Sequence, residues 1–160
     1  MMKKNEHSDL KTVLEKYILE HIPITSPMGI RVDQATPEQV ILFAPSSPNI
    51  NHKMTVFGGS LHAVATLACW GLLYLKLLEI NLSAQIVISS SEVQYLAPVT
   101  TDFKAECHMP DSIEWKKFIK ILERKGKGRI KLHAKIFQDH QLAVSYTGTF
   151  VALKTEREKS

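Results

Sequence analysis

The segment from Thr55 to Leu75 constrains the fold of this chain more than any other. Its twenty-one residues carry no formal charge, with Gly58-Gly59 near the start and Lys76 directly after the end. A helix that is apolar on all sides is expected to be buried on all sides. The segment therefore predicts a long central helix that begins at about Gly58 and is surrounded by the rest of a domain.

The same segment is long enough to span a bilayer, which needs roughly 20 apolar residues. We favour a buried helix, because the segments that follow it have the pattern of core strands and because small or polar residues occupy its first half. These residues are Gly58, Gly59, Ser60, His62 and Thr66. No membrane span is therefore expected.

Composition and charge favour one ordinary domain. The chain has 160 residues, of which 44% are hydrophobic, so a packed core is expected. Its 20 Lys and Arg residues are mixed with 16 Asp and Glu and form no dense stripe with aromatic residues, which argues against a nucleic-acid partner. Cys69 and Cys107 form neither a disulfide framework nor a C-x-x-C site, and the histidines are scattered, so no metal is expected. The N-terminus has no apolar signal segment, and we interpret the protein as cytoplasmic.

The residues before the central helix predict one helix and two strands. Ser8 or Asp9 is placed to cap an amphipathic helix from Leu10 to about His21, which Pro23 ends. Residues 28–33 and 39–44 then have strand character and are joined by a turn at residues 35–38.

The residues after the central helix predict at least four strands. Residues 84–99 form a long strand candidate in which the serines at 89–91 suggest a bulge that resets the alternation. Further period-two segments lie around residues 103–107, 130–136 and 142–152, and Asp111 or Ser112 caps a short helix between the first two. The whole is an α+β domain over residues 1–160, with about five to six strands and flexible ends at about 1–8 and 155–160.

Three motifs, together with this order of elements, make the chain similar to a known protein family. Asn51 lies seven residues before Gly58-Gly59 at the helix start, and a later strand ends in Tyr95-Leu96-Ala97-Pro98. Over residues 10–153 the chain resembles the hotdog-fold acyl-CoA thioesterases, in which a curved antiparallel sheet wraps a central helix. It looks closest to the thioesterase-like domain at the C-terminus of YiiD-type acetyltransferases. Phe57 departs from the usual His, and Thr66 stands where an acidic residue is usual.

The resemblance implies an acyl-thioester hydrolase that acts on acyl-CoA or acyl-carrier protein. Coenzyme A or phosphopantetheine would enter as part of the substrate, and no other cofactor is expected. A homodimer or a dimer of dimers is implied, with active sites in which Asn51 and Gly58 of one chain meet Thr66 of the other. A dimer would also cover an exposed edge strand.

Thioester hydrolysis needs a polarised carbonyl, an oriented water and a base that serves the water. The N–H groups of Gly58 or Gly59 suit the first task, Asn51 and Thr66 the second, and His62 is a candidate general base. Each residue also has a structural interpretation. The glycines permit close packing, Asn51 forms an Asx turn, Thr66 bonds the carbonyl four residues back, and His62 is a core residue.

Further residues are assigned to substrate binding, and three serines are kept in reserve. The basic loop before the fifth strand could hold the phosphates of coenzyme A, although a solvated turn explains it equally well. The residues assigned to the substrate are Phe57, Ser60, Tyr95, Pro98, Lys125, Lys127 and Arg129. Ser89, Ser90 and Ser91 are reserve candidates, because their spacing back from Tyr95 does not match the strand hydroxyl of some of these enzymes.

Two other functions remain open. The cleft could bind an acyl chain or pantetheine arm without turning it over, which the missing acid at Thr66 favours. A dehydratase or isomerase of the same fold would need a catalytic His in the cleft. Phe57 stands in place of that His, which argues against this class of enzyme.

Overall fold

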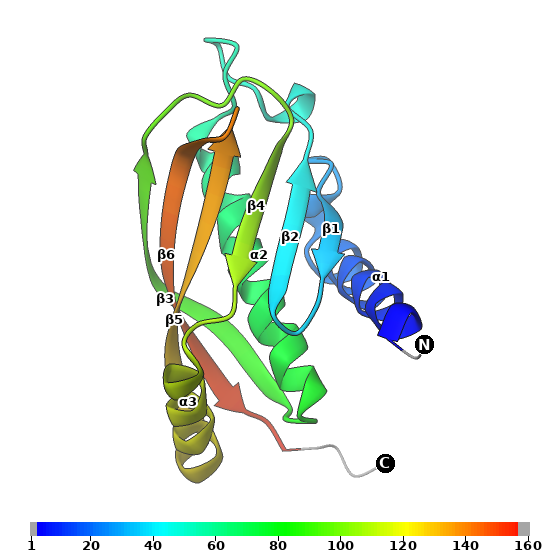
Figure 1. Ribbon diagram of the computed structural model, residues 1–160, viewed down its shortest axis with the longest axis vertical. Helices are drawn as coiled ribbons and strands as arrows, with labels where there is room; N and C mark the ends of the chain where they lie inside the picture. Colours follow the sequence, from blue (N-terminus) through cyan, green and yellow to red (C-terminus); the bar gives the residue numbers. More distant parts are fainter. Residues whose placement is uncertain (1–2, 157–160) are drawn as a thin grey trace.

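A single antiparallel sheet forms the frame of the molecule. The computed structural model describes residues 3–156 of the chain, with side chains from Leu10 onward. The elements are α1 (Lys3–His21), η1 (Pro23–Thr25), β1 (Arg31–Ala35), β2 (Gln39–Ala44), η2 (Ser47–Asn49), α2 (Gly58–Glu79), β3 (Ala84–Tyr95), β4 (Phe103–His108), α3 (Ser112–Lys125), β5 (Lys127–Gln138) and β6 (Gln141–Lys154). The six strands lie in the order β1-β2-β4-β5-β6-β3, and every neighbouring pair is antiparallel (Figure 1).

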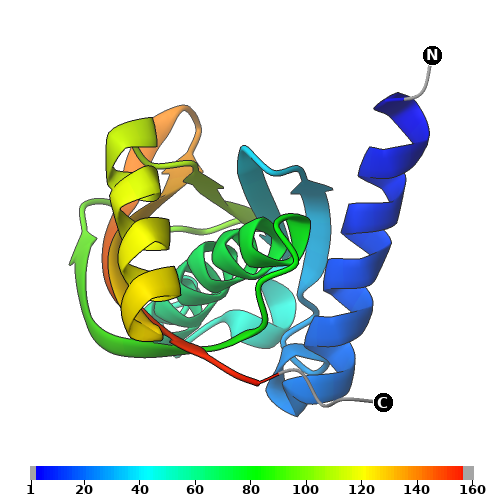
Figure 2. The ribbon, with the colours of Figure 1, turned by 90° about the horizontal axis from the view of Figure 1, so that it is seen from below.

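The sheet curves around α2, as the resemblance to the hotdog fold implied. Seen along the helix, α2 lies inside the curve, with α1 on one side and α3 on the other (Figure 2). It contacts β2, β3, β4, β5 and β6, whereas α1 packs against β1 and α3 against β5. The predicted α+β architecture with a long central helix and about five to six strands is confirmed, with six strands.

One stripe of α2 is not covered by the sheet. Half of the helix residues are buried, including Leu61, Ala65 and Leu72, and the helix is long and apolar enough to cross a membrane by length and composition alone. The expectation that it is buried on all sides was nevertheless wrong. A sheet wraps only part of a helix, and residues three and four apart share the face left over. That face carries the partly or fully exposed residues Gly59, His62, Ala63, Thr66, Trp70 and Tyr74.

The serine run in β3 contains the predicted bulge. The register with β6 shifts between Ile88 and Ser90, so that Ile88 pairs with Phe150 and Ser91 with Gly148. Paired residues point to the same face of a sheet. The bulge thus turns Ser91 toward α2, together with the earlier Ile88.

Three predicted boundaries were wrong. The backbone of α1 is already helical from Lys3, so neither Ser8 nor Asp9 starts it; Ser and Asp lower the stability of a helix interior only modestly. β1 begins at Arg31 instead of Met28, because η1 and a left-handed turn at Gly29 (φ 71°) precede it. The supposed loop at 125–128 shrinks to Gly126.

Gly126 ends α3 in the left-handed conformation (φ 72°), and its N–H donates to the Leu122 carbonyl. At the other end of α3, Asp111 is the cap and accepts from the Ile113 N–H at 2.7 Å. The predicted flexible ends fall partly on residues 1–2 and 157–160, which lie outside the described residues.

Candidate functional site

A cavity of about 460 Å³ lies along the open stripe of α2. Its second wall comes from the segment between α1 and β1, and its third from β3 and β6. The lining residues are Ile22, Ile24, Thr25, Met28, Ile30, Gly59, His62, Ala63, Thr66, Leu67, Trp70, Ile86, Ile88 and Phe150. The volume is in the range of small-molecule sites. The mostly apolar lining suits a hydrocarbon chain, and Gly59, His62 and Thr66 bring polar groups to it.

The first turn of α2 offers unused backbone donors at one end of this cavity. Phe57 precedes the helix and makes no side-chain cap. Within residues 3–156, no acceptor lies within hydrogen-bonding geometry of the Gly58 or Gly59 N–H. Such N–H groups, at the positive end of the helix dipole, stabilise an anion. The Gly59 backbone, on the cavity wall, therefore has an N–H group that is not used within the described part of the chain.

Tyr95 fixes the start of α2 to the end of β3. Its hydroxyl donates to the Gly58 carbonyl at 2.9 Å, and a Cβ at Gly58 would lie 3.3 Å from its ring. The other residues that were assigned to substrate binding here do not line the cavity. Phe57 and Pro98 are exposed, and Ser60 is half-buried beside the helix start.

His62 is held by a strand residue that was only a reserve candidate. Its Nε2 lies 2.9 Å from the Ser91 hydroxyl, across the gap between α2 and β3. Its ring also packs against Tyr146 of β6, with 5.6 Å between centroids. The helix and the bulged strand therefore fix the imidazole at the cavity wall. Sequence spacing missed Ser91, because the exact position of the bulge decides which serine faces inward.

Tyr146 brings a buried hydroxyl to the same place. The residue is 1% exposed, and its hydroxyl has no hydrogen-bond partner within the described residues. Burial raises its pKa to about 12. The Thr66 and Ser91 hydroxyls lie close enough to lower this pKa in part, yet neither has the geometry of a full hydrogen bond to Tyr146. In the sequence Tyr146 is one of several period-two core residues, and only its polar tip at an apolar position distinguishes it.

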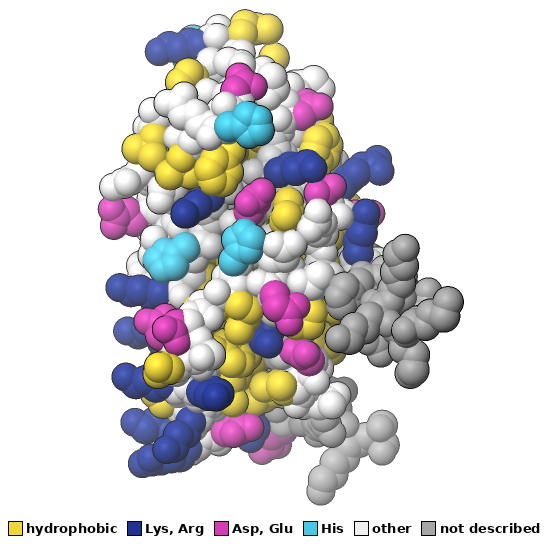
Figure 3. Space-filling model, in the orientation of Figure 1, with side chains coloured by type: hydrophobic (Ala, Val, Ile, Leu, Met, Phe, Trp, Pro, Cys, Tyr) yellow, Lys and Arg dark blue, Asp and Glu magenta, His cyan; other side chains and the backbone are white. Residues whose placement is uncertain are grey.

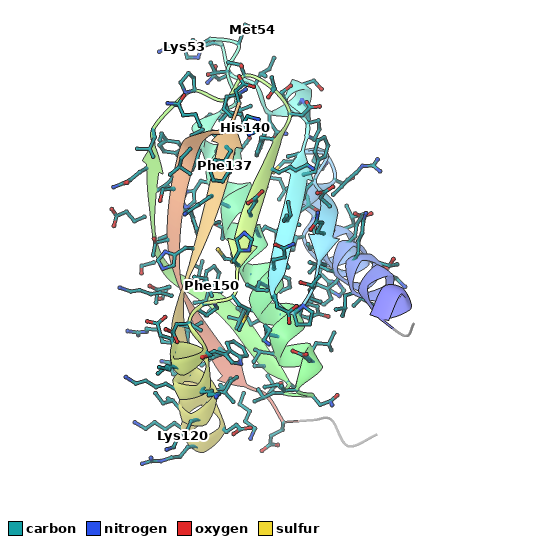
Figure 4. All side chains as sticks on the ribbon, in the orientation of Figure 1. Lys53, Met54, Lys120, Phe137, His140 and Phe150 are labelled. Carbon is teal, nitrogen blue, oxygen red and sulfur yellow. The ribbon has the colours of Figure 1, made fainter. Side chains whose placement is uncertain are left out.

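Asn51 is engaged in its own loop. Its Oδ1 accepts from the Lys53 N–H at 2.8 Å, and its Nδ2 donates to the Thr55 hydroxyl at 3.0 Å. The tip of this loop, with Lys53 and Met54, projects from one end of the molecule (Figure 4). In a single chain Asn51 forms an Asx turn, which was the structural alternative to a catalytic role. It does not line the cavity.

The neighbouring Asn49 was missed by the sequence analysis and anchors the entry to α2. It is buried, and its Nδ2 donates to the Met28 and Pro45 carbonyls at 2.9 and 2.8 Å. Its own carbonyl accepts from the Phe57 N–H at 2.7 Å. Its role is to fix where the helix begins.

The basic residues Lys125, Lys127 and Arg129 lie far from the helix start. They are exposed, and Gly126 beside them borders a hollow with Ile80 at the C-terminal end of α2. The 22 residues of α2 span about 33 Å. Lys and Arg side chains gather over α3 at the lower left of Figure 3, and Lys120 marks the same end in Figure 4. In one chain these groups do not reach Gly58.

No metal site is found in the described part of the chain: no three His, Cys, Asp or Glu side chains cluster there in a way that could hold an ion. The two cysteines are free and buried. Burial raises the pKa of the Cys69 thiol well above its usual value, and the nearby Cys107 raises it further. Such a thiol is an inert core group.

Known proteins match this chain over nearly its whole length. The model of the family described as "Putative thioesterase (yiiD_Cterm)" matches residues 11–154. A solved protein of unknown function from Chlorobaculum tepidum is 37% identical, with a TM-score of 0.89 over 92% of this chain and 96% of that one. A putative thioesterase from Shewanella oneidensis is 29% identical, with a TM-score of 0.82 over 91% and 99%. A thioesterase from Haemophilus influenzae has the same fold at 13% identity, with a TM-score of 0.71 over 94% of each chain.

Proposed function

Because the chain belongs to the putative thioesterase family of YiiD C-terminal domains, we propose that it hydrolyses acyl thioesters of coenzyme A or of acyl-carrier protein. The observation that carries the proposal is the apolar cavity on α2, whose wall includes the open first turn of the helix. An acyl chain would lie in the cavity, and its carbonyl oxygen would accept from the Gly58 or Gly59 N–H. Preorganised donors of this kind stabilise the charge that develops on a thioester carbonyl.

His62 is the group best placed to serve as the general base. It lines the cavity, and in the neutral form an imidazole nitrogen can take a proton from water. The oxygen of that water bonds to the carbonyl carbon, the carbon–sulfur bond breaks, and the proton passes to the leaving sulfur. The products are a carboxylic acid and a thiol.

A homodimer or a dimer of dimers would complete the site. Gly58 and Thr66 are eight residues apart on one helix, which is about 12 Å, so one carbonyl cannot contact both in the same chain. The outer edge of β3 has no partner strand within residues 3–156, and its Val87 and Ile88 are 47% and 43% exposed. Pairing of this edge between two copies would satisfy its backbone and let Gly58 and the Asn51 loop of one protomer approach Thr66 of the other.

The location proposed for the protein is the cytoplasm. Both cysteines are buried and unpaired, which suits a reducing compartment.

Thiol release from a panel of short to long acyl-CoAs tests the proposed activity. Turnover is expected to peak at one chain length, because the cavity is finite, and to fall at least about 100-fold in His62→Ala when the base is removed. His133→Ala is the matched control, since His133 lies on the outer face of the sheet, bonded to Thr147. Equal loss in both variants would contradict the role of His62.

A non-catalytic acyl- or pantetheine-binding module is the second candidate. The observation in its favour is that no Asp or Glu of the described residues lines the cavity, and Thr66 stands at the position where an acid was expected. Saturable binding of acyl-CoA without thiol release would select this function over hydrolysis.

A further inference from the structure

We propose that the hydroxyls of Tyr146 and Thr66 hold one water molecule where Thr66 borders the cavity, beside the His62 imidazole that Ser91 positions, and that this water attacks the thioester. The water site follows from the structure of the single chain. Its catalytic part rests on the proposed hydrolase function.

The first step is the unpartnered Tyr146 hydroxyl. Buried polar groups are almost always bonded to protein or to ordered water. The hydroxyl has no partner among the described residues, although the residue is 1% exposed. Tyr146 lies on β6 beside β3, and its ring contacts His62 of α2. A buried water is the ordinary partner for such a group when two or more further polar atoms are within reach.

The second step is the set of hydroxyls around it. Thr66 comes from α2 and Ser91 from β3, and both are close enough to lower the pKa of Tyr146 against the effect of burial. Gly148 lies opposite Ser91, and a Cβ at this position would lie 2.6 Å from the Tyr146 hydroxyl. Because Gly148 has no side chain, the space beside that hydroxyl stays open. The Tyr146 hydroxyl of β6 thus has hydroxyls of α2 and β3 near it, and one of them, Thr66, borders the cavity.

The third step is the base. The 2.9 Å contact with Ser91 holds the imidazole of His62, and the Tyr146 ring packs on it. A water bonded to Tyr146 and Thr66 would therefore stand beside His62. With Nε2–H donating to the Ser91 hydroxyl, the free Nδ1 of the imidazole takes one proton of the water as the carbon–oxygen bond forms, and this proton then passes to the sulfur as the carbon–sulfur bond breaks. Ser91 acts on this step as a positioning residue, through His62.

A crystal structure that shows ordered water tests the site without reference to activity. In the wild-type chain, one water is expected within hydrogen-bonding distance of the Tyr146 Oη and the Thr66 hydroxyl, and it should be lost in Tyr146→Phe. A second readout is thermal unfolding. If the hydroxyl is bonded to water, Tyr146→Phe should not raise the melting temperature. A dry hydroxyl, with a variant of higher melting temperature, would overturn the proposal.

Steady-state kinetics test the catalytic part. Tyr146→Phe and Thr66→Val should each lower kcat about 10- to 100-fold and leave KM within about twofold, because only the attacking water is disturbed. Their controls are Tyr17→Phe on α1 and Thr147→Val on the outer face of the sheet. If kcat is unchanged in both test variants, the assignment of the water is wrong. If the wild type cleaves no thioester, the hydrolase function fails, and the crystallographic result still decides the water site.

Variants of the serines separate positioning from a direct attack by Ser91. If Ser91 is a positioning residue, the Ser91→Ala variant should have a lower kcat and the Ser91→Thr variant an unchanged kcat. The side chain of Ser90 faces the other side of β3, so Ser90→Ala should leave kcat unchanged. Mass spectrometry of the protein during turnover should show no acyl group on Ser91. An acyl adduct there would make Ser91 the nucleophile and overturn the proposal that water attacks first.

Discussion

At the scale of single residues, the proposed hydrolysis depends on Thr66, which stands where the resemblance implied an acidic residue. The polar groups that the cavity wall offers are hydroxyls, one imidazole and backbone N–H groups. A hydroxyl at its ordinary pKa orients water but does not take its proton. Among the cavity-lining residues that the structure describes, the imidazole of His62 is then the one basic side chain, and we expect hydrolysis to be slow.

Restoring the acid tests this view. Thr66→Asp places a carboxylate beside the proposed water and should raise kcat about tenfold, since a general base contributes at least that much. Thr147→Asp, on the outer face, serves as the control. The measurement is thiol release at saturating acyl-CoA. No change in either direction would remove Thr66 from the site.

Burial of Tyr146 predicts a stability loss in strong alkali. Its pKa is raised to about 12 in the folded protein, against about 10 in the unfolded chain. The folded state therefore holds the proton more tightly. Its contribution to stability is complete below pH 10 and is lost as the pH rises toward 12. Urea unfolding at pH 9 and pH 11 should show a smaller alkaline loss in Tyr146→Phe than in the wild type. If the wild type and Tyr146→Phe lose the same unfolding free energy between pH 9 and pH 11, the Tyr146 phenol is exposed to water in the folded protein.

At the scale of elements, the open stripe of α2 sets the shape of the cavity. Trp70 lies at one end of the cavity lining and stacks on Tyr74, with 5.1 Å between ring centroids. A second hollow of about 300 Å³ begins at Tyr74 and shares Ile86 with the first. Trp70 and Tyr74 therefore stand between two hollows that follow the same helix.

Removing the Trp70 ring should join the hollows and favour longer acyl chains. Each additional buried methylene contributes about 0.8 kcal/mol, or roughly fourfold in kcat/KM. For Trp70→Ala we expect the ratio of kcat/KM for long over short chains to rise about tenfold or more. Trp115→Ala changes the other tryptophan, which packs on Phe118 of α3, and should leave the ratio unchanged. If the preferred acyl chain length is the same in Trp70→Ala as in the wild type, the end of the acyl chain does not lie against Trp70.

At the scale of the whole molecule, the two ends of α2 have different surroundings. The start of α2 and the loop that carries Lys53 and Met54 lie at one end, and α3 with Lys120 lies at the other (Figures 1 and 4). The unpaired β3 edge runs between them. A dimer through this edge would place the helix start of one copy against the stripe of the other.

Mixing two inactive variants tests whether the site is shared. Asn51→Ala and His62→Ala should each be inactive alone. Subunit exchange between them should restore about a quarter of wild-type activity, because half of the dimers are mixed and one of their two sites is intact. No recovery after exchange, with dimers confirmed by light scattering, would place the whole site in a single chain.

The order of elements was largely predictable from local pattern. Period-two alternation identified β4, β5 and β6, and the uncharged run identified α2, because these periods depend only on neighbours along the chain. The Gly58-Gly59 start and the bulge in β3 were also found. Boundaries were less certain, since η1 and the turn at Gly29 displace the start of β1.

By itself the sequence determined that a long apolar helix would pack on a mainly antiparallel sheet, and which glycines would begin that helix. Both follow from local periodicity and backbone chemistry. Only the tertiary structure decided which stripe of α2 stays open, which serine meets His62, and that the Tyr146 hydroxyl is buried without a partner. These depend on contacts between residues up to 84 positions apart, such as His62 and Tyr146. A one-residue change in the β3 register would turn Ser91 away.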